Sequence, residues 1–121
     1  MATAEKVNLT EKLALFDDRF RPKTVGTLND YKLQLVKVQG EFVWHTHEDT
    51  DDFFLVLKGS LTIQLRDRDV ELSAGELFVV PRGVEHCPRA EHETHVLLIE
   101  PVGTINTGEI KSDLTAPDER I

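Results

Sequence analysis

Three histidines and a run of carboxylates are the residues of this chain best suited to chemistry. His45 and His47 lie two residues apart, the acidic stretch 48–52 follows them, and His86 comes after an intervening apolar segment. Imidazole nitrogens combined with one carboxylate oxygen are typical ligands of Fe, Mn, Ni, Zn or Cu, and three or four protein ligands leave room for water or substrate. Taken alone, the pair of histidines favours a plainer interpretation, in which both face solvent beside an acidic loop.

Local sequence explains how these side chains could converge. Residues 42–47 are rich in aromatic and β-branched side chains and predict a strand, in which His45 and His47 point to the same face. Residues 53–57 predict the next strand, and Asp52 at its start could turn its carboxylate toward that face.

A second segment, 75–86, contains a glycine turn, a short apolar strand, a Pro-x-Gly turn and then His86. Together the two segments resemble the paired motifs of the cupin superfamily, and in particular its small single-domain type-2 members. The first motif is matched by Gly40, His45, His47, Asp52 and Gly59, and the second by Gly75, Pro81, Gly83 and His86. The resemblance covers roughly residues 40–90 in both residue type and interval.

This resemblance implies one divalent transition metal per chain, Fe, Mn, Ni or Zn, held by His45, His47 and His86 with Asp52 as a possible fourth ligand. The family pattern has Glu where this chain has Asp52, and aspartate is one methylene shorter. The three histidines are therefore the firmer part of the predicted site. Asp51 is an alternative fourth ligand, because it fits the shorter of the two spacings that the motif permits.

Length and composition predict one small domain spanning residues 1–121, since 40% apolar residues can supply a single core. The net charge of −8 argues against nucleic acid or an anionic membrane as a partner, because phosphates are bound by basic surfaces. No stretch has the length of a membrane span, and no apolar signal core follows the N-terminus, so a cytoplasmic protein is expected. Cys87 is the only cysteine, which excludes an intrachain disulfide.

Turn signals and alternating patterns predict an all-β fold. Asn8 and Glu11 have the spacing of a capping box and predict a short N-terminal helix, placed at 8–20 and ended by Pro22. Short strands at regular intervals predict a sandwich or a jelly-roll β-barrel over about 30–101, followed by a polar tail, 102–121, that crosses the surface or a partner subunit. The expected strands are 31–38, 42–47, 53–57, 60–66, 69–73, 77–81 and 94–100.

Strand alternation also predicts an apolar outer face. If the histidines and Asp52 point inward, large apolar side chains point outward, and exposed patches of this kind mark interfaces. Because cupin barrels commonly pair, the resemblance implies a homodimer. The alternative is that Trp44 and Phe53 pack under the N-terminal helix. The predicted outward set is Phe42, Trp44, Phe53, Leu55 and Leu57.

The remaining candidates carry less chemistry. His92 and His95 are expected to be ordinary surface or packing residues, and Cys87 a buried, unreactive thiol. Arg82 and Arg89 flank His86 and could hold an anionic substrate, although solvated charges are the simpler interpretation.

Two classes of function fit the sequence. The first is a metal-dependent enzyme, an oxygenase or an isomerase acting on a small carbonyl, carboxylate or sugar-phosphate compound. The second is a metal- or ligand-binding cupin without turnover. Cupin folds host many chemistries, so the fold does not choose between the two classes.

Overall fold

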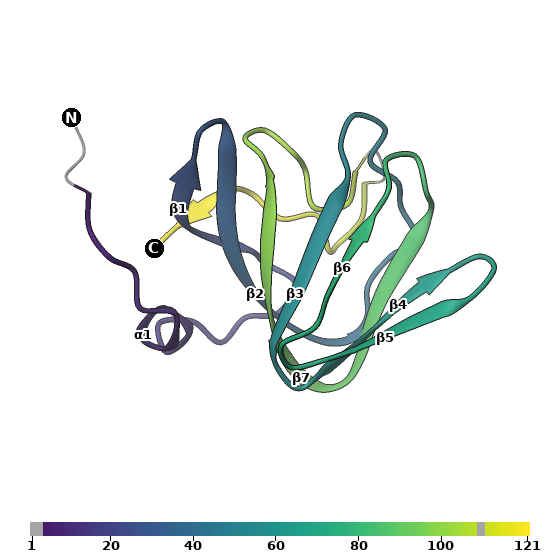
Figure 1. Ribbon diagram of the computed structural model, residues 1–121, viewed down its shortest axis with the longest axis horizontal. Helices are drawn as coiled ribbons and strands as arrows, with labels where there is room; N and C mark the ends of the chain where they lie inside the picture. The colour runs from purple at the N-terminus through teal and green to yellow at the C-terminus, as the bar shows by residue number, and fades with distance from the viewer. Residues whose placement is uncertain (1–3, 109–110) are drawn as a thin grey trace.

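The computed structural model describes residues 4–108 and 111–121, and strands dominate it (Figure 1). The first three residues of the predicted domain, and residues 109–110 of the predicted tail, lie outside the described residues. In chain order the elements are α1 (Leu9–Leu13), β1 (Lys23–Leu28), β2 (Tyr31–Glu41), β3 (Asp52–Lys58), β4 (Ser60–Leu65), β5 (Asp69–Ser73), β6 (Leu77–Val80), β7 (His86–Pro101) and β8 (Glu119–Arg120).

The long strand β7 joins two halves of the sheet. Its C-terminal half pairs antiparallel with β2 on one side and with β3 on the other, and β6 continues the sheet beyond β3. Its N-terminal half pairs with β4, whose other edge carries β5 in a hairpin that extends away from the other strands (Figure 1). Hydrogen bonding does not close the described strands into a ring. The predicted jelly-roll architecture with one short helix is confirmed.

The predicted strand 42–47 is wrong. β2 ends at Glu41, and beyond it only His45 forms a bridge, with His86. The amide of Phe42 donates to the carbonyl of Pro88, while His45 and His86 exchange both backbone hydrogen bonds. The chain advances by three residues from Phe42 to His45, whereas the paired stretch of β7 advances by only two, from His86 to Pro88. The extra residue acts as a bulge, which interrupts the ladder and changes which side chains face inward.

The N-terminal helix is shorter than predicted. Asn8 caps it as expected, with its side chain accepting from the amide of Glu11, but the helix ends at Leu13 instead of near residue 20. The chain then lies against β2, where the Lys37 ammonium donates to the carbonyl of Phe16 at 2.6 Å.

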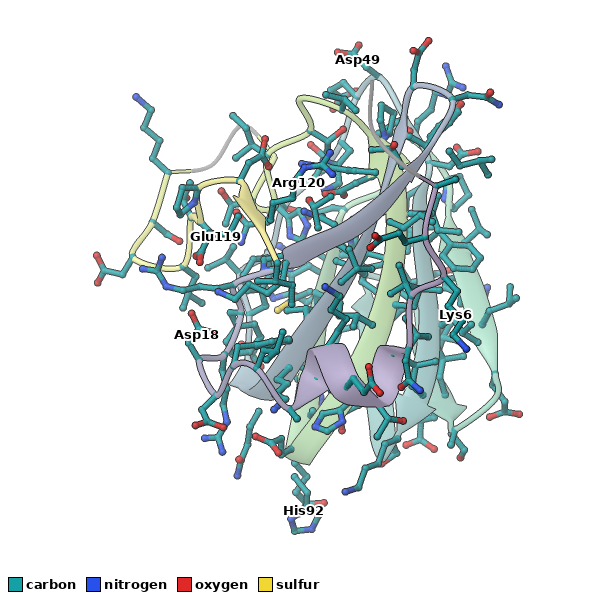
Figure 2. All side chains as sticks on the ribbon, turned by 90° about the vertical axis from the view of Figure 1, so that its left-hand side faces the viewer. Lys6, Asp18, Asp49, His92, Glu119 and Arg120 are labelled. Atoms are coloured by element: carbon teal, nitrogen blue, oxygen red, sulfur yellow. The ribbon has the colours of Figure 1, made fainter. Side chains whose placement is uncertain are left out.

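Two strands went unpredicted, β1 and β8. β1 pairs with β2, and β8 adds in parallel beside β1 through Glu119 and Arg120 (Figure 2). The end of the tail therefore joins the sheet of its own chain. The tail was predicted to cross the surface or a partner subunit, and neither path describes residues 119–120, which form a strand beside β1.

The alternation predicted for β3 is confirmed. Asp52, Phe54 and Val56 are buried, whereas Phe53, Leu55 and Leu57 on the other face are half-buried. The core is formed mainly by side chains from the inner faces of β2, β3, β4 and β7, and includes Val36, Val38, Phe54, Val56, Leu61, Ile63, Val96 and Leu98.

Candidate metal site and cavity

Four buried side chains meet on the inner side of the sheet. His45, His47, Asp52 and His86 each offer one ligand atom, and these atoms all lie within 4.8 Å of one another. Each of the four is at most 8% exposed. Three nitrogens and one carboxylate oxygen at this spacing form a set that could hold a transition metal, and this donor chemistry fits Fe, Mn, Ni or Zn.

The backbone places each of these side chains. His45 and His86 face each other in the isolated bridge, which brings their rings to a centroid distance of 4.3 Å. Asp52 is the first residue of β3. His47 is anchored by its carbonyl, which accepts from the amide of Gly83 in the turn before His86. Gly83 has a φ of 77°, a conformation that favours glycine. The glycine of the Pro-x-Gly turn therefore allows the backbone geometry of this turn.

Hydrogen bonds orient two of the imidazoles. Nδ1 of His45 lies 2.8 Å from the carbonyl of Val43, and Nδ1 of His86 lies 2.9 Å from the carbonyl of Val84. A carbonyl only accepts, so in both rings Nδ1 carries the proton. When the ring is neutral, Nε2 is then left with a lone pair for a ligand.

Asp52 reaches the histidines despite being shorter than glutamate. Its Oδ2 lies 2.9 Å from Nε2 of His86 and 3.4 Å from Nε2 of His47. The alternative acid, Asp51, is exposed, and its Oδ1 accepts from the backbone amide of Arg82. The structure thus brings Asp52, and not Asp51, into the cluster.

Burial favours the neutral form of two of the histidines, His45 and His47. Desolvation, assisted by the neighbouring His86, lowers the pKa of His45 to about 4, and desolvation also lowers the pKa of His47. Neutral imidazole is the form that binds metal, so little proton competition is expected from these two residues at neutral pH.

A cavity opens beside the cluster and is lined mainly by apolar side chains. The cavity has a volume of about 50 Å³, which is room for a small ligand. Ten of its fifteen lining residues are apolar, so the polar contacts available to a ligand come from few side chains. Those polar residues are His45, His47, Asp52, Glu100 and Asn106.

Glu100 was not anticipated from the sequence. It lies on β7, is 4% exposed and lines the cavity, and desolvation raises its pKa to about 8. Lys32 lies 3.7 Å from its carboxyl group and does not line the cavity. The alternation of β7, in which Val96, Leu98 and Glu100 are buried, was the only signal that could have indicated it.

Asn106 from the tail was also missed. Its side-chain amide donates to the carbonyls of Phe20 and Leu114, and its oxygen accepts from the amide of Ala116. These bonds hold Asn106 in the lining of the cavity. No periodicity in the tail could have predicted this position.

Phe42 does not face outward as the sequence suggested, whereas Trp44 lies outside the cavity lining. Phe42 lines the cavity and stacks on Phe20, with ring centroids 5.2 Å apart. Trp44 is covered by the guanidinium of Arg66, 3.7 Å from its ring centroid, and not by α1. The bulge after β2 accounts for the inward position of Phe42.

The other histidines and the cysteine take no part in the cluster. His92 is exposed at the opposite end of the molecule from Asp49, which lies in the loop of the acidic run (Figure 2). His95 contacts Glu93 at 3.4 Å. Cys87 is fully buried and burial raises its pKa to about 11, which agrees with an unreactive thiol.

The two arginines near His86 are exposed and paired with acids. Arg82 lies 3.9 Å from Asp51, and Arg89 lies 3.4 Å from Asp69. Neither lines the cavity beside the cluster. They therefore behave as surface charges.

Comparison with known proteins supports the same family. The Cupin domain family matches residues 32–101. A cupin-2 domain containing protein from Shewanella frigidimarina NCIMB 400 is 47% identical, with a TM-score of 0.78 over 78% of this chain and 93% of that one. Protein NMB1881 from Neisseria meningitidis is 31% identical, with a TM-score of 0.74 over 80% and 99%. Protein YdbB from Bacillus subtilis (strain 168) is 33% identical over 64% of this chain and 69% of its own length.

Proposed function

The chain belongs to the cupin domain family, and on that premise we propose that it is a metal-dependent cupin that binds one divalent transition metal through His45, His47 and His86, with Asp52 as the fourth ligand. The metal would be Fe, Mn, Ni or Zn. Its substrate would be a small molecule in the adjoining cavity, transformed by an oxygenase or isomerase reaction. We also propose that the whole chain forms one such domain.

The observation that carries this proposal is the cluster itself. Burying four ionisable side chains within 4.8 Å of one another costs folding free energy unless a ligand compensates them. Two of the imidazoles already have Nδ1 engaged by backbone carbonyls, which is the support expected of metal-binding histidines. Fold stability alone gives no reason for such an arrangement.

Each part of the site has a chemical task in this proposal. A bound metal would supply a Lewis acid or a centre for O₂ chemistry. The chain would orient the ligand imidazoles, exclude water with the apolar wall, and offer the carboxyl group of Glu100 as a hydrogen-bonding group that is not a ligand. A cavity containing a non-ligand acid favours turnover over simple metal storage.

Metal analysis of purified protein tests the proposal. We expect about one transition metal per chain in the wild type and a sharp loss of occupancy in His47→Ala. The exposed His92→Ala variant is the matched control and should keep its metal. Full occupancy in His47→Ala, or no tightly held metal in the wild type, would remove the proposal. O₂ uptake and isomerisation assays with candidate substrates then separate an enzyme from a binding protein.

A homodimer is the second part of the proposal. On the outer face of the sheet, two cross-strand rows of apolar side chains run through β6, β3 and β7, in the registers Val79–Phe53–Ile99 and Leu77–Leu55–Leu97. Leu77 is 55% exposed and Val79 is 40% exposed. The N-terminal segment lies against β2, where the carbonyl of Phe16 accepts from Lys37, and we propose that a second copy of the chain covers the apolar rows.

Localisation stays a prediction. No helix in the described part of the chain is long and apolar enough to cross a membrane. The expected cytoplasmic location is not tested by this finding.

A further inference from the structure

We propose that the cavity selects a small, largely apolar compound with a single metal-binding group, and that it rejects compounds carrying a second charged group, including sugar phosphates. This inference deepens the proposed function and rests on the metal site described above. It narrows the substrate to neutral or singly charged small molecules whose remaining surface is hydrocarbon.

The chemistry of the wall is the first support. Apart from three of the clustered residues, His45, His47 and Asp52, the lining offers two polar side chains, Glu100 and Asn106, and otherwise aliphatic and aromatic groups. No lysine or arginine is found among the described residues that line this cavity. Charged groups such as phosphates are normally bound by arginine, lysine or clusters of backbone amides.

Lys32, the buried cation beside Glu100, cannot serve in place of a lysine or arginine in the cavity wall. The Lys32 ammonium donates to the carbonyl of Thr104 at 2.9 Å and to Asp118 at 2.8 Å, and it also lies 3.7 Å from Glu100. Two carboxyl groups and a carbonyl therefore already surround it. Whatever the protonation state of Glu100, that residue adds no positive charge to the wall.

The charge balance sets the rule for ligands. A divalent ion with one ligand carboxylate, Asp52, keeps a net positive charge, so one anionic or polar group of a ligand can be accommodated at the metal. A second charge on the same small molecule would lie against apolar side chains such as Val38, Leu61 and Leu98. Burying an unpaired charge in such surroundings carries a large penalty.

Matched four-carbon probes test this rule. Butyrate carries one carboxylate, succinate carries two, and succinamate replaces the second carboxylate by a neutral amide. On wild-type protein of measured metal content, butyrate should bind at least ten-fold more tightly than succinate by titration calorimetry, with succinamate between them. Equal or tighter binding of succinate would overturn the inference, and so would the failure of butyrate to bind.

A variant with a cation in the wall sharpens the test. Phe42 is half-buried, so Phe42→Arg can place a guanidinium at the cavity without disturbing the strands. The variant should bind succinate at least as tightly as butyrate. Leu77→Arg, on the exposed edge strand, is the control and should keep the wild-type preference. If Phe42→Arg does not fold, the wild-type probe series still decides the question.

A neutral probe separates this inference from the metal proposal. In metal-free protein, cyclohexanol should shift the NMR signals of the Leu61 and Leu98 methyl groups, and succinate should not. Protein that holds no metal but still prefers cyclohexanol would refute the proposed function and keep the cavity rule. Protein that holds metal but takes succinate as well as butyrate would refute the cavity rule alone.

Discussion

The two faces of one sheet, formed by β2, β7 and β3, depart in different ways from the usual apolar interior and polar exterior. On the inner face, buried ionisable side chains, among them Asp52 and Glu100, lie among apolar neighbours. On the outer face, the half-buried Phe53, Leu55, Leu97 and others form apolar rows across β3, β6 and β7.

This difference separates stability from function. A sheet selected only to fold would bury its apolar face and expose its polar one, since alternation makes that arrangement available at no conformational cost. Here the inner face accepts the desolvation of carboxyl and imidazole groups, and the outer face accepts the exposure of leucine and valine. A bound metal and its substrate would compensate the buried ionisable groups of the inner face. A second copy of the chain would cover the apolar side chains of the outer face.

Removing two imidazoles from the inner face should have the largest effect. With free Zn²⁺ at about a thousand times its dissociation constant, binding should stabilise the wild type by about 4 kcal/mol. His45→Ala/His86→Ala should lose this stabilisation, as measured by denaturant unfolding with and without the metal. Leu77→Ala on the outer face is the control. A double variant that metal still stabilises fully would place the site elsewhere.

A charge on the outer face should break assembly and leave the metal in place. Leu55 sits between Leu77 and Leu97 in the cross-strand row, so Leu55→Lys would have to bury an ammonium at the proposed interface. We expect dimerisation to weaken by about 100-fold or more by sedimentation across a concentration series. Metal content should not change, and Val7→Lys, on the exposed N-terminal segment, is the control. A wild type that is monomeric at every concentration would exclude the interface.

The sequence predicted the site better than the strands around it. The two histidine-bearing motifs identified all four clustered residues, because their spacing reflects chemistry as well as backbone geometry. The strand 42–47 failed because one extra residue between Phe42 and His45 bulges the pairing with β7. A bulge depends on the partner strand, so it cannot be read from local alternation.

Long-range packing explains what the sequence left out. Glu100 belongs to a strand whose pattern looked ordinary, and only the fold brings it to the cavity beside Asp52. Asn106 lies in a segment without periodicity, where tail hydrogen bonds and not local propensity fix its place. β1 and β8 are short and pair with each other across most of the chain length, which no local signal encodes.

Changes to Asp52 should produce a moderate effect. Its carboxylate already lies within hydrogen-bonding distance of His86, so Asp52→Ala should weaken metal binding by about ten-fold or more, as expected for a ligand or the orienting partner of one. Asp52→Glu should bind at least as tightly as the parent, since the longer side chain has the family's usual length. Chelator competition measures both. A loss in Asp52→Glu as large as in Asp52→Ala would show that the shorter carboxylate is fitted to this site.

The pH dependence of stability in metal-free protein should show two opposing contributions from the inner face. The pKa of His45 is lowered to about 4 by burial, so between about 4 and 6.5 the unfolded chain binds more protons, and stability falls as the pH falls through that window. The pKa of Glu100 is raised from 4.5 to about 8, so there the folded chain binds more protons, and stability falls as the pH rises from about 4.5 to 8.

Substitution of Glu100 tests the second contribution and should give the smallest effect. Glu100→Gln keeps the shape of the side chain and cannot ionise, so its stability relative to the wild type should rise between pH 5 and 8. At pH 8 the gain should be on the order of 1–2 kcal/mol, because loss of the Lys32 contact offsets part of it. Urea unfolding at several pH values measures the gain, with the exposed Glu91→Gln as control. A difference that does not vary with pH would mean that Glu100 titrates in the folded protein as it does in water, and that the inner face does not desolvate this carboxyl group as the structure indicates.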